Sequence, residues 1–137
     1  MNHYAGAIIE SNGKMLLFQQ RDAKPEITNP GMVSTFGGGI EPGEDSKQSL
    51  RRELDEELGL DVNDYTTVFM GKYYKTVKKH GEDCECFIYL ITGVEKDKLD
   101  LREGKSIIEY NPNEDCPDDF TLLAKELIDD YKNRFME

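Results

Sequence analysis

The chain has 137 residues, with 28 acidic and 17 basic side chains and a formal net charge of −11. This length predicts one domain over residues 1–137. The acidic balance argues against a stable nucleic-acid partner or binding to an anionic membrane, but bound metal ions could still admit a phosphate substrate. The sequence has no apolar run long enough to span a membrane and no signal peptide at its N-terminus, so we expect a cytoplasmic protein.

The first half of the chain alternates apolar runs with turn residues. Residues 4–10 and 14–20 are predicted to form a β-hairpin around a Ser-Asn-Gly turn. Residues 22–31 contain two prolines and a glycine, which indicates a loop. Residues 32–36 are predicted to be extended and to lead into a glycine turn at 37–39.

A helix is predicted to begin near Asp45 or Ser46, because Asp45 and Gln48 are spaced as in a capping box. Its leucines recur every four residues and define one buried stripe. The stripe consists of Leu50, Leu54 and Leu58. Gly59 is expected to end the helix, since glycine is favoured just after a helix C-terminus.

The second half of the chain is predicted to contain more strands and a second helix. The predicted segments are strands at 65–70 and 72–77 hinged near Gly71, a polar tip at 78–83, strands at 84–93 and 107–110 joined by a charged loop, and a helix at 121–135 capped by Asp118 or Thr121. This order of elements predicts an α+β domain in which helices flank a mixed sheet.

Three cysteines, Cys84, Cys86 and Cys116, form an odd set that argues against a disulfide framework. Cys84 and Cys86 are expected to share one face of a strand. A zinc site is disfavoured because no fourth ligand follows at a familiar spacing. Reduced, half-buried thiols are the preferred interpretation.

Glu53, Glu56 and Glu57 share one face of the first predicted helix, because they are three and four residues apart. Like charges at this spacing repel, but a divalent cation would explain their arrangement. Mg²⁺ takes oxygen ligands and often completes its shell with water and substrate phosphates. The preceding glycines would let the backbone approach a metal or phosphate closely. The stretch therefore indicates metal-dependent chemistry on a phosphate compound.

The stretch from Gly38 to Leu60 resembles the Nudix box without a gap. The matching positions are Gly38, Glu44, Arg52, Glu53, Leu54, Glu56, Glu57, Gly59 and Leu60. A solvated acidic helix would not explain this register. The resemblance to Nudix hydrolases implies an α/β/α sandwich with a mixed central sheet. It also implies hydrolysis, with Mg²⁺ or Mn²⁺, of a nucleoside diphosphate linked to another group.

By this resemblance, the metal ligands are Glu53, Glu56, Glu57 and the carbonyl group of Gly38. Arg52 is expected to orient a glutamate through a bidentate ion pair. Glu44 is expected to support the same cluster. The alternative is that Arg52 and Glu44 mainly brace the helix against its loop.

The general base stays open between Glu53 and a glutamate on a later loop. Glu103 is the preferred loop residue, and Glu82 and Glu85 are rivals. Other side chains are candidates for substrate binding. These are Arg21, Lys72 and Lys75 for phosphate, and Tyr73 or Tyr74 for stacking on a base.

The box predicts the reaction but not the substrate. Nucleoside triphosphates, including damaged ones, are the first candidates, followed by nucleotide sugars and dinucleoside polyphosphates. A non-catalytic nucleotide-binding module is the alternative, although such modules commonly lose box glutamates and this chain keeps all four. An isomerase acting on isoprenoid diphosphates would require an active-site cysteine and a longer chain. A homodimer is compatible with the family.

Overall fold

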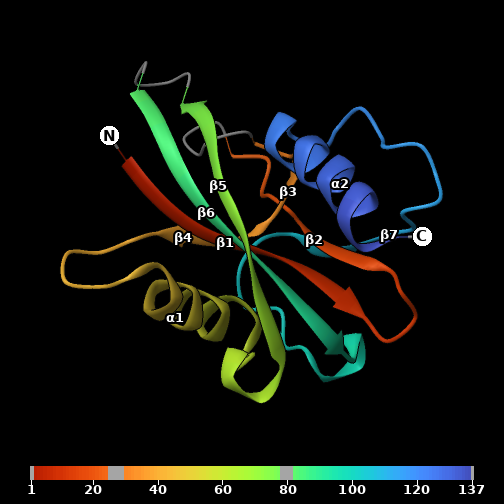
Figure 1. The fold of residues 1–137 in the computed structure, drawn as a ribbon, viewed down its shortest axis with the longest axis horizontal. Helices are drawn as coiled ribbons and strands as arrows, with labels where there is room; N and C mark the ends of the chain where they lie inside the picture. Colours follow the sequence, from red (N-terminus) through yellow and green to blue (C-terminus); the bar gives the residue numbers. More distant parts are fainter. Residues whose placement is uncertain (1, 25–29, 78–81, 137) are drawn as a thin grey trace.

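The computed structural model describes residues 2–24, 30–77 and 82–136, in which seven strands form a mixed sheet between two helices (Figure 1). The strands are β1 (Asn2–Ser11), β2 (Leu16–Gln20), β3 (Val33–Ser34), β4 (Phe36–Gly39), β5 (Thr66–Val77), β6 (Glu82–Val94) and β7 (Ser106–Tyr110). The α-helices are α1 (Ser46–Leu58) and α2 (Leu122–Phe135), and the 3₁₀ turns are η1 (Val62–Asp64) and η2 (Lys96–Lys98).

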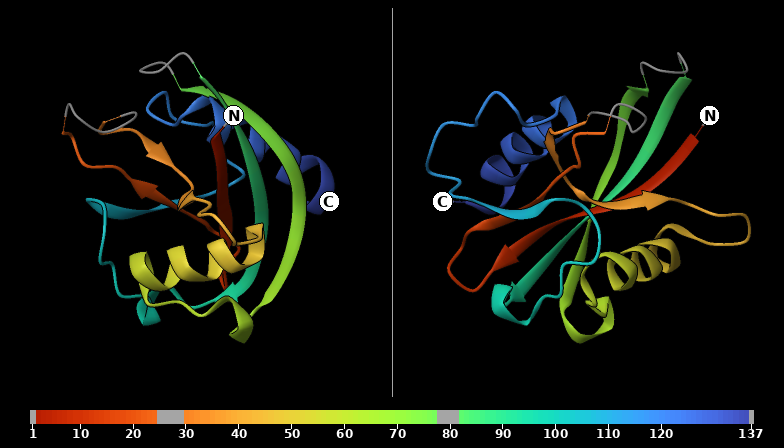
Figure 2. Two further views of the ribbon diagram at one scale, coloured as in Figure 1. Left: turned by 90° about the vertical axis from the view of Figure 1, so that its left-hand side faces the viewer. Right: turned by 180° about the vertical axis from the view of Figure 1, so that it is seen from behind.

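Strand β1 lies at the centre of the sheet. It runs parallel to β6 and antiparallel to β2 and β4, which pair with different parts of its length. Strands β3 and β7 pair with β2, and β5 pairs with β6. The predicted hairpin of β1 and β2 is confirmed. Figure 2 shows α1 and α2 on opposite sides of the sheet, so the predicted α+β sandwich with a mixed sheet is also confirmed.

The core has two layers because side chains alternate across a strand. On β1, Ile8 packs in the layer under α2, whereas Ala7 and Ile9 pack in the layer under α1. The leucine stripe of α1 is fully buried in the second layer, as predicted. This packing fixes the rotation of α1 about its axis and therefore determines which of its glutamates turn toward the sheet.

The ends of both helices follow the local sequence. Asp45 accepts a hydrogen bond from the backbone N–H of Gln48 at 2.8 Å, and the Gln48 side chain accepts from Asp45 N–H at 2.9 Å. The predicted capping box is therefore confirmed. Gly59 ends α1 with a left-handed φ of 62°, which glycine adopts at little cost. Thr121, rather than Asp118, caps α2.

The structure corrects two local predictions. Residues 37–39 are not a turn but part of β4, because their backbone groups pair with residues 4–6 of β1. Residues 66–77 form one strand rather than two, since β5 pairs with β6 along its whole length and absorbs the irregularity as a bulge between Phe69 and Gly71. The predicted polar tip at 78–83 falls largely outside the described residues.

The cysteines of β6 lie deeper than predicted. Cys84 and Cys86 share the face under α2, as expected, but both are buried rather than half-buried, and both are free thiols. Burial raises the pKa of Cys86 to about 12, which favours an inert thiol. Neither α1 nor α2 has the length and hydropathy that a membrane-spanning helix requires.

Candidate active site

Glu57 lies at the centre of the candidate site, between α1 and β4. Its side chain is only 2% exposed, and its carboxylate accepts hydrogen bonds from Gly37 N–H at 3.0 and 3.3 Å. Burial raises the pKa of this carboxyl group from 4.5 to about 8. The bond from Gly37 opposes the shift, whereas the charges of Glu53 and Glu103 add to it. A carboxylate so poorly solvated is favourably placed to receive a cation.

Glu53 lies one helical turn from Glu57 and directly against β4. A Cβ atom at position 38 would collide with the Glu53 carboxyl group, so only glycine permits this approach. Burial raises the pKa of Glu53, and Glu56 and Glu103 raise it further, although Arg52 opposes the shift. Glu53, Glu57 and Glu103 therefore repel one another across a partly dehydrated space.

Arg52 connects the helix to the loop before it. Its Nε and Nη2 atoms donate to the two carboxylate oxygens of Glu44 at 2.9 and 3.0 Å, which is a bidentate pair. Its Nη1 atom donates to Glu53 at 2.9 Å, and Nη2 also donates to the carbonyl oxygen of Gly39 at 3.1 Å. The pair holds the pKa of Glu44 down to about 2. The same guanidinium thus braces the loop and orients Glu53, which combines both roles considered from the sequence.

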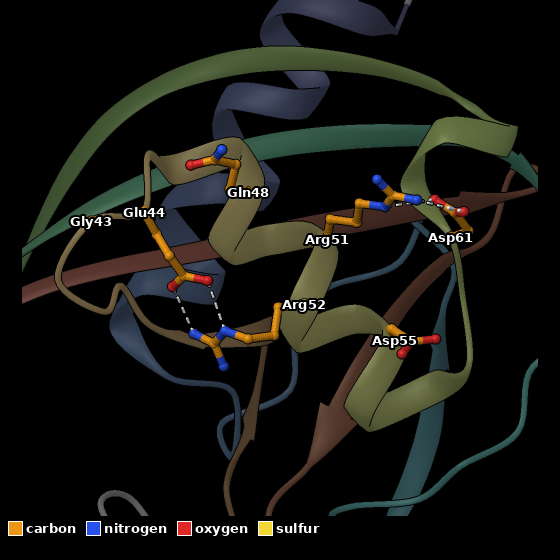
Figure 3. Close-up of a pocket in the computed structure, with 7 residues that line it drawn as sticks. All are labelled: Gly43, Glu44, Gln48, Arg51, Arg52, Asp55 and Asp61. Carbon is orange, nitrogen blue, oxygen red and sulfur yellow. Dashed lines mark hydrogen bonds and ion pairs between the residues drawn. The ribbon is translucent and has the colours of Figure 1, made fainter.

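A hollow lies along the outer side of α1 (Figure 3). It is lined by Gly43, Glu44, Gln48, Arg51, Arg52, Asp55 and Asp61. Arg51 pairs with Asp61 across it, at 3.3 Å. The hollow shares Arg52 and Glu44 with the site but contains none of the predicted metal ligands Glu53, Glu56 and Glu57.

Glu56 and Glu103 lie at the margin of the cluster. The Glu56 side chain is 49% exposed, and its carboxylate is 3.6 Å from Arg52 Nη1. Glu103 is exposed on the loop before β7, close enough to raise the pKa values of both Glu53 and Glu57. Arg21, at the end of β2, lowers the pKa of Glu57. Tertiary folding therefore brings α1, Glu103 and Arg21 together.

Tyr73 is not placed as expected. Its ring is buried in the layer under α2, and its hydroxyl group donates to Asp130 at 2.7 Å. It joins β5 to α2, and its buried ring is not available to stack on a base. Tyr74 is exposed, on the opposite face of β5, and its hydroxyl group donates to Glu85 at 3.3 Å.

The two candidate lysines lie on opposite faces of the sheet. Lys72 lies over the ring of Phe87 at 5.3 Å, and Lys75 lies over the ring of Tyr4 at 4.2 Å, on the other side of the sheet. Tyr4 packs against the core layer under α2 and Phe87 against the layer under α1, so Lys72 is the lysine on the α1 face of the sheet. Glu85 pairs with His3 at 3.3 Å. The side chain of Glu82 falls outside the described residues.

The donor set suits a hard divalent cation. Its side chains offer only oxygen ligands, which Mg²⁺ prefers. A bound cation would favour the charged forms of Glu53 and Glu57, whose pKa values are raised first by burial and then by neighbouring glutamates. Among the described residues, no three His, Cys, Asp or Glu side chains converge on a single point. The Arg52 guanidinium instead lies between Glu53 and Glu56.

Sequence reasoning did not single out Arg102 or Gln19, which hold the Glu103 loop in place. Arg102 N–H donates to the Glu57 carbonyl oxygen at 2.8 Å, and Gln19 Nε2 donates to the Glu103 carbonyl oxygen at 3.3 Å. Neither residue belongs to a motif. The contacting residues lie far apart in the sequence, so no local pattern predicts these contacts. The sequence therefore predicted a loop at Glu103 but not the contacts that hold it.

Comparison with known proteins agrees with this geometry. The chain is 32% identical to an uncharacterized Nudix hydrolase of Nostoc sp. over 122 residues, which cover 89% of this chain and 63% of that protein. It is 46% identical over 52 residues to the nucleoside triphosphatase NudI of Enterobacter sp., covering 38% of this chain and 36% of that one. It is 44% identical over 62 residues to the CTP pyrophosphohydrolase of Escherichia coli, covering 45% and 44%. The chain therefore spans less than two thirds of each of these relatives.

The fold is shared with solved structures of low sequence identity. A MutT Nudix hydrolase from Burkholderia pseudomallei superposes with a TM-score of 0.77 at 20% identity, over 94% of this chain and 96% of that one. A MutT protein from Methanosarcina mazei gives 0.78 at 16% identity, over 97% and 95%. The sequence model of the NUDIX domain matches residues 2–131. Fold, box and sequence match together place this chain in the Nudix hydrolase family.

Proposed function

We propose that the protein is a Mg²⁺-dependent pyrophosphohydrolase that cleaves a phosphoanhydride bond in nucleoside triphosphates. The observation that carries this proposal is the buried carboxylate of Glu57 beside β4, which accepts from Gly37 N–H at 3.0 Å, with the carboxyl group of Glu53 against Gly38 one helical turn earlier. Two relatives, named as a nucleoside triphosphatase and a CTP pyrophosphohydrolase, match this chain over segments of 52 and 62 residues. They favour triphosphates over nucleotide sugars and dinucleoside polyphosphates.

The residues of the site divide the work of hydrolysis. Glu53, Glu56, Glu57 and the Gly38 carbonyl group would hold Mg²⁺, which supplies charge neutralisation of the phosphates and activation of water when bound. Gly37 N–H fixes the Glu57 carboxylate through its hydrogen bonds. Arg52 fixes Glu53 and ties it to the loop through Glu44. Because these carboxylates are already held in place, they would need less reorganisation during the reaction.

Glu103 is the general base in this proposal. Its side chain is exposed and can meet an attacking water, whereas the Glu53 carboxylate is engaged by Arg52 at 2.9 Å. Arg21 is proposed to contact the substrate phosphates, because it lies near enough to lower the pKa of Glu57. Lys72 and Lys75 stay candidates from the sequence for contact with phosphate. The cytoplasmic compartment and the homodimer stay predictions from the sequence.

The first test is phosphate release by the purified protein with Mg²⁺, measured with and without an added phosphatase. The panel would contain ribo- and deoxyribonucleoside triphosphates, oxidised dGTP, ADP-ribose, nucleotide sugars and diadenosine polyphosphates. The variant Glu57→Gln is expected to lose most of the activity. The matched control is Glu95→Gln, which makes the same change at a half-exposed carboxylate paired with Lys98 in η2.

Each outcome has a distinct meaning. Metal-dependent turnover of triphosphates that is lost in Glu57→Gln and kept in Glu95→Gln would support the proposal. Turnover of nucleotide sugars or dinucleoside polyphosphates alone would refute the substrate class. If Glu57→Gln hydrolysed as fast as the wild type, the assigned metal site would be wrong. A folded protein that binds Mg²⁺ and nucleotide but turns over nothing would be a binding module.

A further inference from the structure

Residues 100–102 close the C-terminal end of α1. The backbone N–H groups of Asp100 and Arg102 donate to the carbonyl oxygens of Leu58 and Glu57 at 2.9 and 2.8 Å. The guanidinium of Arg102 donates through Nη1 to the carbonyl oxygen of Asp55 at 3.1 Å. The last four carbonyl groups of a helix lack partners within the helix. A segment more than 40 residues away in the sequence supplies three of the donors here.

The Arg102 side chain is half exposed and makes two side-chain hydrogen bonds. Its Nε atom donates to the Asp100 carboxylate at 3.0 Å, while Nη1 donates to Asp55. Its guanidinium also lies against Gly59, where an added Cβ atom would be 3.0 Å from Nη2. A cation at this end of α1 is favoured by the helix dipole. Arg102 therefore ties the segment to the helix through both charge and geometry.

The other side of the same loop is anchored to β2. Gln19 is 7% exposed, and its amide donates to the carbonyl oxygen of Glu103 at 3.3 Å. Lys105 N–H donates to the carbonyl oxygen of Gln20 at 2.9 Å. Glu103 is thus held between two anchors, one on the helix that carries the metal-binding glutamates and one on the sheet. We call residues 100–105 the strap.

We propose that Arg102 is a positioning residue, which sets the place of Glu103 relative to Glu53 and Glu57 by fastening the strap to α1. This inference rests on the proposed function, in which Glu103 acts as general base. Arg102 itself points to the helix backbone and touches no carboxylate of the cluster among its hydrogen bonds. Its effect on the reaction would therefore pass through Glu103.

The kinetic test is a double-mutant cycle between Arg102→Ala and Glu103→Gln. Arg102→Ala is expected to lower kcat by about 10- to 100-fold, as for residues that orient a catalytic group, with KM changed less than about twofold. In the Glu103→Gln background the same change should lower kcat by less than about twofold. A full loss in both backgrounds would overturn the inference, because Arg102 would then act independently of Glu103.

Two further variants separate positioning from folding. Arg51→Ala removes another arginine that is half exposed on α1 and paired with an aspartate, but it has no contact with the strap. It should leave kcat unchanged. Arg102→Lys keeps a cation at the helix end and should keep the thermal stability, but a lysine ammonium cannot replace the guanidinium fork. Its kcat is expected to stay about 10-fold below that of the wild type, and full recovery would refute a positioning role.

A second readout does not depend on turnover. Amide hydrogen exchange in the metal-free protein should speed up at residues 100–103 in Arg102→Ala, but not in Arg51→Ala or in the core of α2. Unchanged exchange at the strap would overturn the inference even if activity fell. If the wild type hydrolysed no nucleotide but the strap amides loosened as expected, the proposed function would fail while the fastening of the strap by Arg102 would stand.

Discussion

Replacing Glu57 by glutamine is expected to stabilise the metal-free protein even though it removes a metal ligand. Burial raises the pKa of Glu57 from 4.5 to about 8. Between these values the folded state holds a proton that the unfolded state releases, so stability falls as pH rises through this window. Each pH unit within the window costs about 1.4 kcal/mol. The wild type should therefore lose roughly 3 kcal/mol between pH 4.5 and pH 7 through this group.

The assay is urea unfolding in the presence of EDTA, followed by far-UV circular dichroism at several pH values between about 5 and 8. Glutamine keeps an acceptor for Gly37 N–H but does not titrate. The free energy of unfolding of Glu57→Gln should therefore exceed that of the wild type by a margin that grows as pH rises. Mg²⁺ should stabilise the wild type at the upper end of this range and leave the variant unchanged. Glu56→Gln is the matched control. The Glu56 side chain is 49% exposed, so this substitution removes a charge that is not buried.

The reasoning would be refuted by parallel stability curves for wild type and Glu57→Gln across this pH range. That result would mean that Glu57 is solvated in the metal-free protein or that neighbouring groups compensate its charge. A gain of the same size in Glu56→Gln would also count against it, because it would trace the effect to general repulsion on an acidic chain rather than to burial.

Three other changes test the packing and geometry of the site. Arg52→Lys should lower kcat by about 10- to 100-fold in the phosphate-release assay, because lysine cannot pair with both oxygens of Glu44 while also holding Glu53. Activity equal to wild type would show that these contacts of Arg52 are dispensable. Gly38→Ala should reduce activity and Mg²⁺ affinity by calorimetry, since its Cβ atom would displace the Glu53 carboxyl group, and unaltered Mg²⁺ affinity would argue against Glu53 as a ligand. Leu54→Ala should lower the free energy of unfolding by about 2–5 kcal/mol in urea, because the side chain is fully buried; a loss below about 1 kcal/mol would mean that the core closes over the cavity.

Local sequence was sufficient for the elements whose signals lie within a few residues. The capping box at Asp45, the leucine stripe and the C-terminal Gly59 are encoded in one stretch, and α1 begins and ends where they predict. The box also marked the carboxylates of this helix. The same local reasoning misjudged residues 37–39, since a glycine run indicates a turn unless a partner strand is known. Pairing with β1 overrides that tendency, because each paired backbone group satisfies its hydrogen bond.

The amino-acid sequence alone was enough to show which helix carries the carboxylates, in which register they lie, and which glycines stand beside them. Tertiary structure decided which carboxylate is buried, which later loop reaches the cluster, and that Tyr73 packs in the core rather than in the site. Helix register and capping depend on neighbours along the chain, whereas desolvation and the contacts of Arg102 depend on segments that only folding brings together.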